Sequence, residues 1–364
     1  MRPNLIFFLA RFGFGGAGNS VFRLISKLDK KKYKIYVICL NKCAYENQLK
    51  RIGVIIFKVK VKKLIYSIFK IQKIISEISS RNKINFVISN INYTNIFSAI
   101  ILWKNKNIKL IGFERTPIKE LDIYFGIFDF IKKNFLKILL KFSYRRFDRI
   151  ICNSSYICRQ LKDKYGYNSV KINPPSITGN IRIKYNYKTY KEILISTVCR
   201  LSKEKKIEEI IYALKILNNK NIKLIIVGTG PEEKKLVQLI NKLNLQKQVK
   251  FIGFKKNIYN IIKKSNLFLN SSYFEGFPNS VIEAMRIGIP VICSQSHGGI
   301  NEILSNGKYG TIYANGHINL ANEVKNFIKN PTIFFNKAKK AKKYVKKYNL
   351  KNHHYQFNKL LRKI

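Results

Sequence analysis

Two carboxylates eight residues apart are the most informative feature of this chain. Glu275 and Glu283 flank Gly276 and Pro278, a turn that opens a predicted helix over 279–287. The first amides of a helix lack partners within it, and the helix dipole is positive there, so an anionic ligand is favoured. A carboxylate can accept two hydroxyl hydrogens, which suits the diols of a sugar or ribose. The pair predicts a site for such a ligand; the alternative is two solvated carboxylates on a basic protein.

The side chain of Asn279 is expected to cap this helix. Glu283 would then lie one turn inside the helix and Glu275 in the loop before it, so that both face one ligand from different depths. A metal site is not expected here, because there is no Asp-x-Asp pattern and no histidine follows the pair until His297.

Cations and glycines follow the other predicted strands of this half. Arg200 and Lys205 come after the strand at 193–199 and could flank a diphosphate, the arginine as a two-pronged donor and the lysine as a point charge. The alternative is a solvated helix start. Gly228 ends the next strand and predicts a tight turn into a helix, close enough for a nucleotide to approach.

The first half offers two further loops. Gly13 to Gly18 follow the strand at 4–10, and glycines let the backbone approach a phosphate or sugar, unless they merely form a turn. Their spacing does not give the dinucleotide pattern, and no acidic residue ends the second strand. Glu114 and Arg115 follow the strand at 109–113 and could orient an acceptor hydroxyl or a phosphate, or form a solvated ion pair.

Apolar runs alternate with helical patterns through most of the chain, which predicts parallel sheets covered on both faces. The alternation breaks at Pro174 and Pro175 and restarts at Glu192. Two similar α/β domains facing across a cleft are therefore expected, with ligands beyond the carboxyl ends of the strands. The predicted strands are 4–10, 34–41, 54–61, 85–89, 109–113 and 149–153, then 193–199, 224–228, 249–254, 267–270 and 291–294.

Composition agrees with two domains, since 364 residues exceed what one core usually holds. The formal charge of +51 favours anionic partners, whether nucleic acid, a membrane surface or a phosphorylated substrate. Compositional bias is the alternative, because the chain is crowded with Lys, Asn, Ile, Tyr and Phe. No compact nucleic-acid-binding motif is present.

Six cysteines without a C-x-x-C pair predict buried thiols in a reducing compartment. The apolar run from Leu5 to Ala10 is too short for a signal peptide, and no uncharged run of ~18 apolar residues predicts a transmembrane span. Residues 125–147 mix aromatic residues with Lys and Arg. Such a segment can lie in an anionic membrane interface or be an ordinary domain helix.

The assembled pattern resembles the retaining glycosyltransferases of family 4, which have the GT-B fold of two Rossmann-like domains. The resemblance covers essentially the whole chain. It rests on the E-x7-E motif at Glu275 and Glu283, on the Arg…Lys pair at Arg200 and Lys205, and on 298–303, which is similar to the family's Gly-Gly-x-x-Glu-Ile stretch.

This resemblance implies that Glu275 holds hydroxyls of the donor sugar and Glu283 the nucleotide ribose. Arg200 and Lys205 would neutralise the leaving diphosphate. The family's chemistry needs no metal, so no cofactor is expected. The other positions implied to bind the nucleotide sugar are Gly15, Gly16, Gly228, Gly253, Phe254, Gly276, Phe277 and Asn279.

The resemblance also implies an acceptor-binding domain at 1–175, a linker at 176–191, a nucleotide-sugar domain at 192–343 and a C-terminal helix at 344–364 that crosses back. The first domain lacks the histidine that many relatives carry near the reacting sugar. Its Glu-Arg-Thr-Pro segment is similar instead to a variant found in transferases that act on lipid-linked or surface glycans. That likeness gives Glu114 a catalytic role and Arg115 an acceptor contact.

The sequence thus predicts a cytoplasmic enzyme, peripheral on the inner face of the membrane. It would move a hexose or N-acetylhexosamine from a nucleotide sugar, UDP being the expected nucleotide, to a lipid-linked or cell-surface glycan with retention. Transfer to a soluble sugar is the alternative within the fold. A basic nucleic-acid-binding protein, or a sugar sensor that has lost catalysis, are the alternatives from other classes.

Overall fold

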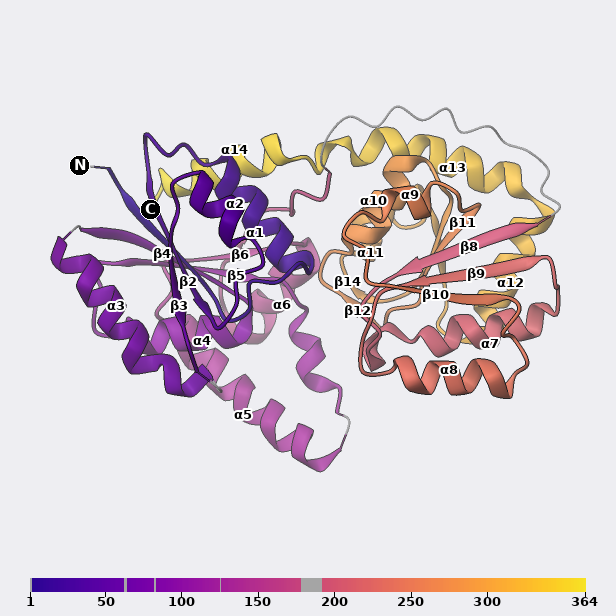
Figure 1. The fold of residues 1–364 in the computed structure, drawn as a ribbon, viewed down its shortest axis with the longest axis horizontal. Helices are drawn as coiled ribbons and strands as arrows, with labels where there is room; N and C mark the ends of the chain where they lie inside the picture. The colour runs from indigo at the N-terminus through magenta and orange to yellow at the C-terminus, as the bar shows by residue number, and fades with distance from the viewer. Residues whose placement is uncertain (1, 62–63, 82, 125, 178–191) are drawn as a thin grey trace. The chain divides into compact units, whose positions relative to one another are not determined.

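The computed structural model describes residues 2–61, 64–81, 83–124, 126–177 and 192–364. The chain forms two compact units, Met1–Pro175 with Asn349–Ile364, and Ser176–Tyr348. Of the predicted linker, 178–191 lie outside the described residues. Each unit is an α/β layer structure around a parallel sheet (Figure 1).

The first unit has a seven-stranded sheet in the order β3-β2-β1-β4-β5-β6-β7. All six neighbouring pairs are parallel. The strand order reverses between β1 and β4, and in doubly wound sheets that switch point is where ligands bind. The strands are β1 (Asn4–Leu9), β2 (Lys34–Leu40), β3 (Ile55–Val59), β4 (Ile84–Asn90), β5 (Lys109–Glu114), β6 (Arg149–Cys152) and β7 (Val170–Lys171).

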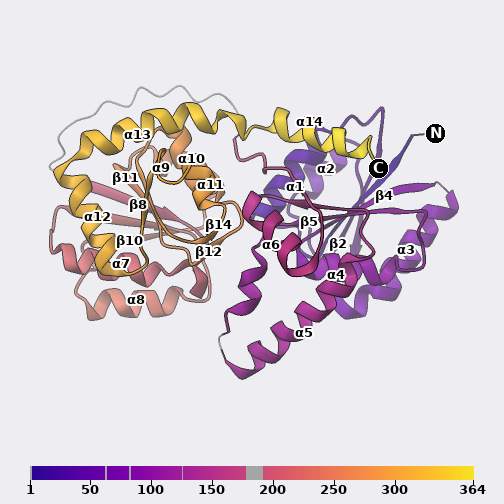
Figure 2. The ribbon, with the colours of Figure 1, turned by 180° about the vertical axis from the view of Figure 1, so that it is seen from behind.

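Alternate side chains of β1 separate the two faces of this sheet. Leu5, Phe7 and Leu9 point into one core, and Ile6 and Phe8 into another, as the two-residue repeat of a strand requires. Helices α1 (Gly16–Lys27), α2 (Glu46–Arg51) and α14 (Leu350–Leu361) cover the first face. Helices α3 (Ile68–Arg81), α4 (Asn92–Ile101) and α5 (Ile127–Tyr144) cover the other (Figures 1 and 2).

The C-terminal helix therefore belongs to the first unit. Phe357 of α14 is fully buried, and its ring stacks on that of Phe113 at 6.1 Å between centroids. The remaining elements of this unit are η1 (Leu64–Ser67), η2 (Ile118–Asp122) and α6 (Ser155–Tyr165).

The second unit has a six-stranded sheet in the order β10-β9-β8-β11-β13-β15, again parallel, and its order reverses between β8 and β11. A two-stranded sheet pairs β12 with β14. The strands are β8 (Ile193–Val198), β9 (Ile222–Val227), β10 (Val249–Gly253), β11 (Leu267–Asn270), β12 (Phe274–Glu275), β13 (Val291–Ser294), β14 (His297–Gly298) and β15 (Thr311–Tyr313).

Helices cover both faces of this sheet too. One core contains α7 (Ile207–Leu217), α8 (Glu233–Lys242) and α12 (His317–Lys329), and the other contains α10 (Asn279–Ile287), α11 (Ile300–Leu304) and α13 (Pro331–Tyr344). Short helical turns complete the unit: η3 (Lys203–Lys205), α9 (Tyr259–Ile262) and η4 (Val345–Lys347).

The eleven predicted strands are all confirmed, each end within two residues. The six cysteines are free thiols, as expected, but only Cys39, Cys152 and Cys293 are buried; the other three are partly exposed. Among the described residues, no helix is both long and apolar enough to cross a membrane.

Candidate active site

The switch point of the second sheet brings together Lys205 and Glu275. Lys205 ends the turn η3 after β8, and Glu275 lies in the short strand β12 after β11. Their charged groups form an ion pair, with 2.7 Å between Lys205 Nζ and Glu275 Oε1. Their side chains are only 17% and 14% exposed, so the pair is largely shielded from water.

Backbone contacts hold these two loops together. The amide of Tyr273 donates to the carbonyl of Glu204 at 2.8 Å. The hydroxyl of Ser271 donates to the carbonyl of Lys205 at 2.7 Å. The distance between lysine and carboxylate is therefore set by main-chain geometry as well as by their attraction.

Polar neighbours complete the surroundings of the Glu275 carboxylate. Oε1 also accepts from the hydroxyl of Ser272 at 2.7 Å and from the amide of Asn270 at 3.4 Å. Burial alone would lower the pKa of Lys205, but the charge of Glu275 and the hydrogen bond to it prevail and raise that pKa above its ordinary value. The lysine is thus held as a cation at the carboxyl edge of the sheet.

Gly298 allows β14 to approach β12 this closely. It has a φ of +138°, and a Cβ there would lie 1.6 Å from the carbonyl oxygen of Glu275. Glu275 pairs with Gly298, and Phe274 with His297. The Gly-Gly segment at 298–299 therefore fixes the backbone that carries the carboxylate.

Arg200 differs from Lys205, the residue with which it was predicted to act. Its side chain is 71% exposed and donates to Glu204 at 3.0 Å and to Ser202 at 3.3 Å. It therefore lies beside Glu204 rather than Glu275 in this structure.

The start of α10 departs from the prediction in one respect. The capping position is Pro278 and no side chain caps the helix, so the predicted cap by Asn279 is wrong. Asn279 is instead the first helical residue, and its Oδ1 accepts from the hydroxyl of Ser176 at 2.6 Å. Glu283 lies one turn into the helix and is half-buried.

The neighbouring loop residues are mostly enclosed. Gly276 is buried, and the ring of Phe277 packs edge-to-face on Tyr348 at 5.1 Å, so a ligand could meet this segment mainly through its backbone. At the ends of β9 and β10, the amide of Gly228 donates to the carbonyl of Gly253 at 3.0 Å. Phe254, the next residue, is exposed.

In the first unit, the switch point holds Arg115. Its guanidinium donates to Asn90 at 3.1 and 3.3 Å and to the hydroxyl of Ser20 at 3.2 Å. It also lies 4.7 Å from the ring centroid of Phe113. Gly15 and Gly16 open α1, the helix that carries Ser20, so the glycine loop and Arg115 meet at the same edge.

Glu114, predicted as a catalytic group, is fully buried. Burial raises the pKa of its carboxyl to about 7, although a hydrogen bond from the Tyr144 hydroxyl acts in the opposite direction. Burial likewise lowers the pKa of Arg115 to about 10. The solvated ion pair considered from the sequence is therefore not what these residues form.

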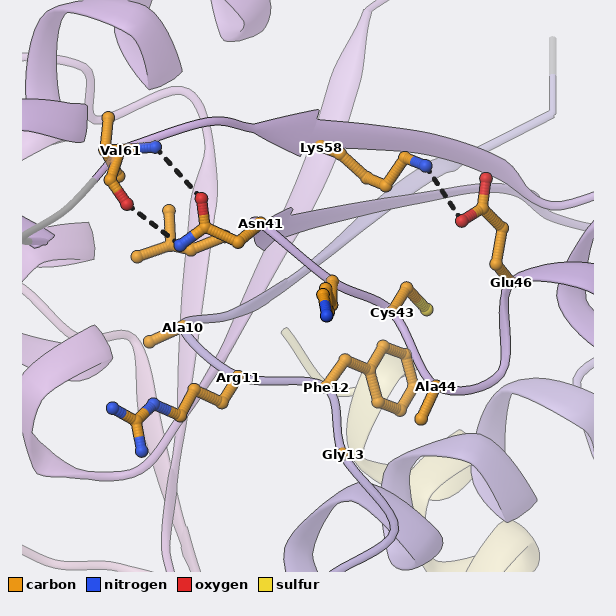
Figure 3. A pocket seen from close by; sticks show the side chains of 12 residues that line it. Ala10, Arg11, Phe12, Gly13, Asn41, Cys43, Ala44, Glu46, Lys58 and Val61 are labelled. Carbon is orange, nitrogen blue, oxygen red and sulfur yellow. Dashed lines mark hydrogen bonds and ion pairs between the residues drawn. The ribbon is translucent and has the colours of Figure 1, made fainter.

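A cavity of about 700 Å³ opens at the carboxyl ends of β1, β2 and β3 (Figure 3). Arg11 and Lys42 line it and are exposed, while Lys58 pairs with Glu46 at 2.9 Å. A hydrogen bond with the Cys39 thiol lowers the pKa of Cys43 to about 7. The cavity is basic and partly apolar, which suits an anionic ligand that carries apolar groups.

Ser272, Asn270 and Glu204 are site residues that the sequence reasoning missed. The serine and asparagine stand beside the motif but have no spacing signal of their own, and Glu204 pairs with Arg200 only in the folded chain. Among the described residues, no group of three or more His, Cys, Asp or Glu could hold a metal ion.

Comparison with known families matches both halves of the chain. The family described as "Glycosyl transferases group 1" matches residues 180–348, and "Glycosyltransferase Family 4" matches residues 14–177. An uncharacterized glycosyltransferase of Methanocaldococcus jannaschii is 30% identical over 306 residues, which are 78% of this chain and 73% of the relative.

A second relative is similar over a shorter stretch. The N-acetylgalactosamine-N,N'-diacetylbacillosaminyl-diphospho-undecaprenol 4-alpha-N-acetylgalactosaminyltransferase of Campylobacter jejuni is 34% identical over 122 residues, 34% of this chain and 33% of the relative.

Solved structures share the fold at low identity. HepE of Anabaena, solved in complex with UDP-glucose, superposes with a TM-score of 0.82 at 18% identity and covers 99% of this chain and 100% of its own. Sucrose-phosphate synthase of Thermosynechococcus elongatus gives a TM-score of 0.83 at 16% identity, covering 100% of this chain and 99% of its own. Both matches extend over the two units.

Proposed function

The chain belongs to the group 1, family 4 glycosyltransferases with the GT-B fold, and we propose that it moves a sugar from a UDP-activated donor to a lipid-linked or cell-surface glycan. The observation that carries this proposal is the shielded ion pair of Lys205 and Glu275 at the switch point of the second sheet.

The pair supplies the two kinds of group that a nucleotide sugar needs. Lys205 would bind the diphosphate and stabilise the charge that develops on it as the sugar leaves. Glu275 would accept hydrogens from the sugar hydroxyls. Arg200 would swing from Glu204 to add a second cation, and Glu283 would hold the ribose. Backbone groups would line the sugar and the diphosphate at Gly15, Gly16, Gly276, Phe277 and Asn279. The base would lie against the backbone of Gly228, Gly253 and Phe254.

We infer retention at the anomeric carbon and a reaction without a metal. The second point is supported by Lys205, a shielded cation beside Glu275, and by Arg200, which would add a second cation for the leaving group once it moves away from Glu204. A hexose or an N-acetylhexosamine is the proposed donor sugar. The choice of UDP is supported by the UDP-glucose complex of the structural relative HepE.

The acceptor would bind to the first unit. Arg115 is proposed to contact it, and the basic cavity beside Arg11 and Lys42 would take its anionic portion. Because Glu114 is fully buried, its proposed role is to position Tyr144 and the Arg115 loop rather than to touch the substrate. A polyprenyl-diphosphate glycan fits a basic cavity, and the name of the Campylobacter relative points to the same class.

Such an acceptor places the proposed enzyme in the cytoplasm, at the inner face of the membrane. The charge of +51 supports an anionic membrane surface as its partner. Nucleic acid is not proposed as a partner.

The test is a sugar-transfer assay with purified protein, a panel of nucleotide sugars and membrane extract. We expect release of UDP from one donor only when extract is present, together with a product whose anomeric proton shows the donor's configuration. UDP release from no donor, or a product of inverted configuration, would refute the proposal. Transfer to a free sugar without lipid would favour the soluble-acceptor alternative.

A further inference from the structure

Helix α5 has two apolar faces, and only one of them is used by the fold. Leu136, Leu140 and Tyr144 are buried in a core with Ile150 of β6 and Ile96 of α4. This face explains why the segment is a domain helix, packed beside α4 at the margin of the first unit (Figures 1 and 2).

The opposite face is a row of exposed apolar side chains. Their spacing of four, four, three and four residues confines five of them to an arc of about 80°, on the other side of the helix from Leu136 and Leu140. Phe128 extends this row and is 86% exposed, more than any of the five. The five are Ile127, Ile131, Phe135, Ile138 and Phe142, each between 56% and 67% exposed.

This arrangement differs from a normal solvent-facing helix. Helix α8 of the second unit buries Leu236 and Ile240 and has one large exposed apolar residue, Val237. Soluble monomers rarely expose a continuous apolar patch of more than a few hundred Å². The row along α5 runs for about 22 Å, and an exposed apolar patch of this kind marks an interaction site.

Cations flank the exposed row. Lys132, Lys141 and Arg145 are exposed, and the guanidinium of Arg145 lies 5.4 Å from the ring centroid of Phe142. The one acidic residue of the helix, Asp129, pairs with Lys133 at 2.8 Å. The exposed face is therefore apolar along its centre and positive at its rim.

Aromatic residues continue the surface beyond the helix. The Tyr124 ring packs edge-to-face on Phe130 at 4.8 Å, and Lys132 lies 5.8 Å from the ring centroid of Tyr93 on α4. Tyr93 and Tyr124 are both exposed. Amphipathic aromatic rings of this kind favour the boundary between lipid and water.

We propose that α5 lies in the plane of an anionic phospholipid bilayer, with the row from Ile127 to Phe142 among the acyl chains and Lys132, Lys141 and Arg145 against the lipid phosphates. Charge selects this occupant. A second copy of a chain with a net charge of +51 would bring like charges together, whereas anionic lipid neutralises them.

This docking extends the proposed function, because it puts the acceptor end of the first unit at the membrane. The buried face of α5 ends at Tyr144, whose hydroxyl donates to Glu114, the residue before Arg115. The helix proposed to lie in the membrane is thus joined by one hydrogen bond to the residue beside the proposed acceptor contact, Arg115.

Vesicle co-sedimentation tests the proposal without any nucleotide sugar. We expect the protein to bind vesicles of phosphatidylglycerol and phosphatidylethanolamine, and to bind phosphatidylcholine vesicles at least about tenfold more weakly. Replacing both Phe128→Ser and Phe135→Ser should lower binding to the anionic vesicles by at least about tenfold, because two large apolar groups no longer enter the lipid. The matched control replaces Ile318→Ser and Ile333→Ser, two exposed residues of the second unit, and should bind like the parent.

Fluorescence reports which face enters the lipid. The chain has one tryptophan, so a Trp103→Phe variant has no tryptophan fluorescence of its own and can carry a new tryptophan as a reporter. In that background, Phe135→Trp should be quenched by lipids brominated on their acyl chains, and Ile333→Trp should not.

Three results would overturn the proposal: no binding to anionic vesicles, binding that the double phenylalanine variant leaves unchanged, or a dimer that this variant dissociates without vesicle binding. A protein that binds vesicles through α5 but transfers no sugar would refute the proposed function and leave this inference standing.

Discussion

Glu114 and Glu275 both stand at the carboxyl edge of a parallel sheet, one in each unit, yet their surroundings differ. Glu275 faces the cation of Lys205 at 2.7 Å and accepts further hydrogen bonds from Ser272 and Asn270. Glu114 is fully buried, and burial raises the pKa of its carboxyl to about 7.

The difference separates a group that can exchange partners from one that cannot. The attraction between Lys205 and Glu275 can be replaced by that between Lys205 and a diphosphate, with the carboxylate released to sugar hydroxyls. The contact of Glu114 with Tyr144 is enclosed in the first unit and joins α5 to β5. We therefore propose that the edge of the second sheet, at Lys205 and Glu275, carries the chemistry and that Glu114 in the first sheet has a positioning role.

The largest expected effect on the transfer rate comes from breaking the ion pair of Lys205 and Glu275. Lys205→Ala should lower the turnover of transfer by ~10²–10³-fold, because it removes a preplaced charge from the leaving group. The matched control is Lys234→Ala, an exposed lysine of the same unit, which makes the same change in net charge. Steady-state kinetics would measure the difference in turnover between the two variants. Equal turnover would contradict the catalytic role proposed for Lys205 at the edge of the second sheet.

A somewhat smaller effect is expected from displacing the carboxylate without deleting it. Gly298→Ala puts a Cβ 1.6 Å from the carbonyl oxygen of Glu275, so the β12 loop must shift. A misplacement of about 1 Å can cost ~10²-fold in rate.

Gly307→Ala is the control for this glycine. Its φ is +94°, but the nearest atom to an added Cβ is 3.8 Å away, so it brings backbone strain without the clash. The Gly298→Ala enzyme should transfer sugar more slowly than the Gly307→Ala enzyme. Equal rates would show that the position of Glu275 is not critical.

The buried acid should be visible in stability rather than in rate. The pKa of Glu114 is raised to about 7, so the folded chain keeps this proton at a pH at which the unfolded chain has lost it. The stabilisation that protonated Glu114 gives the folded chain is fully present below about pH 4.5 and is lost as the pH rises to about 7. The free energy of unfolding changes by about 3 kcal/mol over this range.

Glu114→Gln cannot ionise and should remove this dependence. Urea unfolding at pH 5 and pH 7.5 measures this dependence, and the parent should lose about 2 kcal/mol more stability than the variant between the two values. The contributions of other titrating groups to the pH dependence cancel in this comparison, because both proteins contain those groups. Parallel pH profiles would mean that Glu114 is not held neutral.

The sequence predicted the strands well because each central strand is an apolar run that both faces of a sheet must bury. It missed β7, β12, β14 and β15, which are two or three residues long and too short to show a period. Of these, β12 and β14 matter most, since they hold Glu275.

Side-chain partners were the harder part to predict. Lys205 and Glu275 were assigned separately to the diphosphate and the sugar, and nothing in a spacing of seventy residues indicates that they pair. The predicted cap at Asn279 failed because Pro278 occupies that position. For residues 125–147, the domain-helix interpretation holds for one side of α5, and the exposed row on the other side leaves the membrane interpretation as a proposal.

The central claim is that Lys205 exchanges the carboxylate of Glu275 for the diphosphate of the donor. Calorimetric titration of UDP into the parent, Lys205→Ala and Glu275→Gln proteins tests this claim most directly. Because UDP carries the diphosphate without the sugar, Lys205→Ala should weaken its binding by at least about tenfold. Glu275→Gln should bind UDP at least as tightly as the parent, since the carboxylate that competes for Lys205 is gone. Equal weakening in both variants, or unchanged binding in both, would contradict the account.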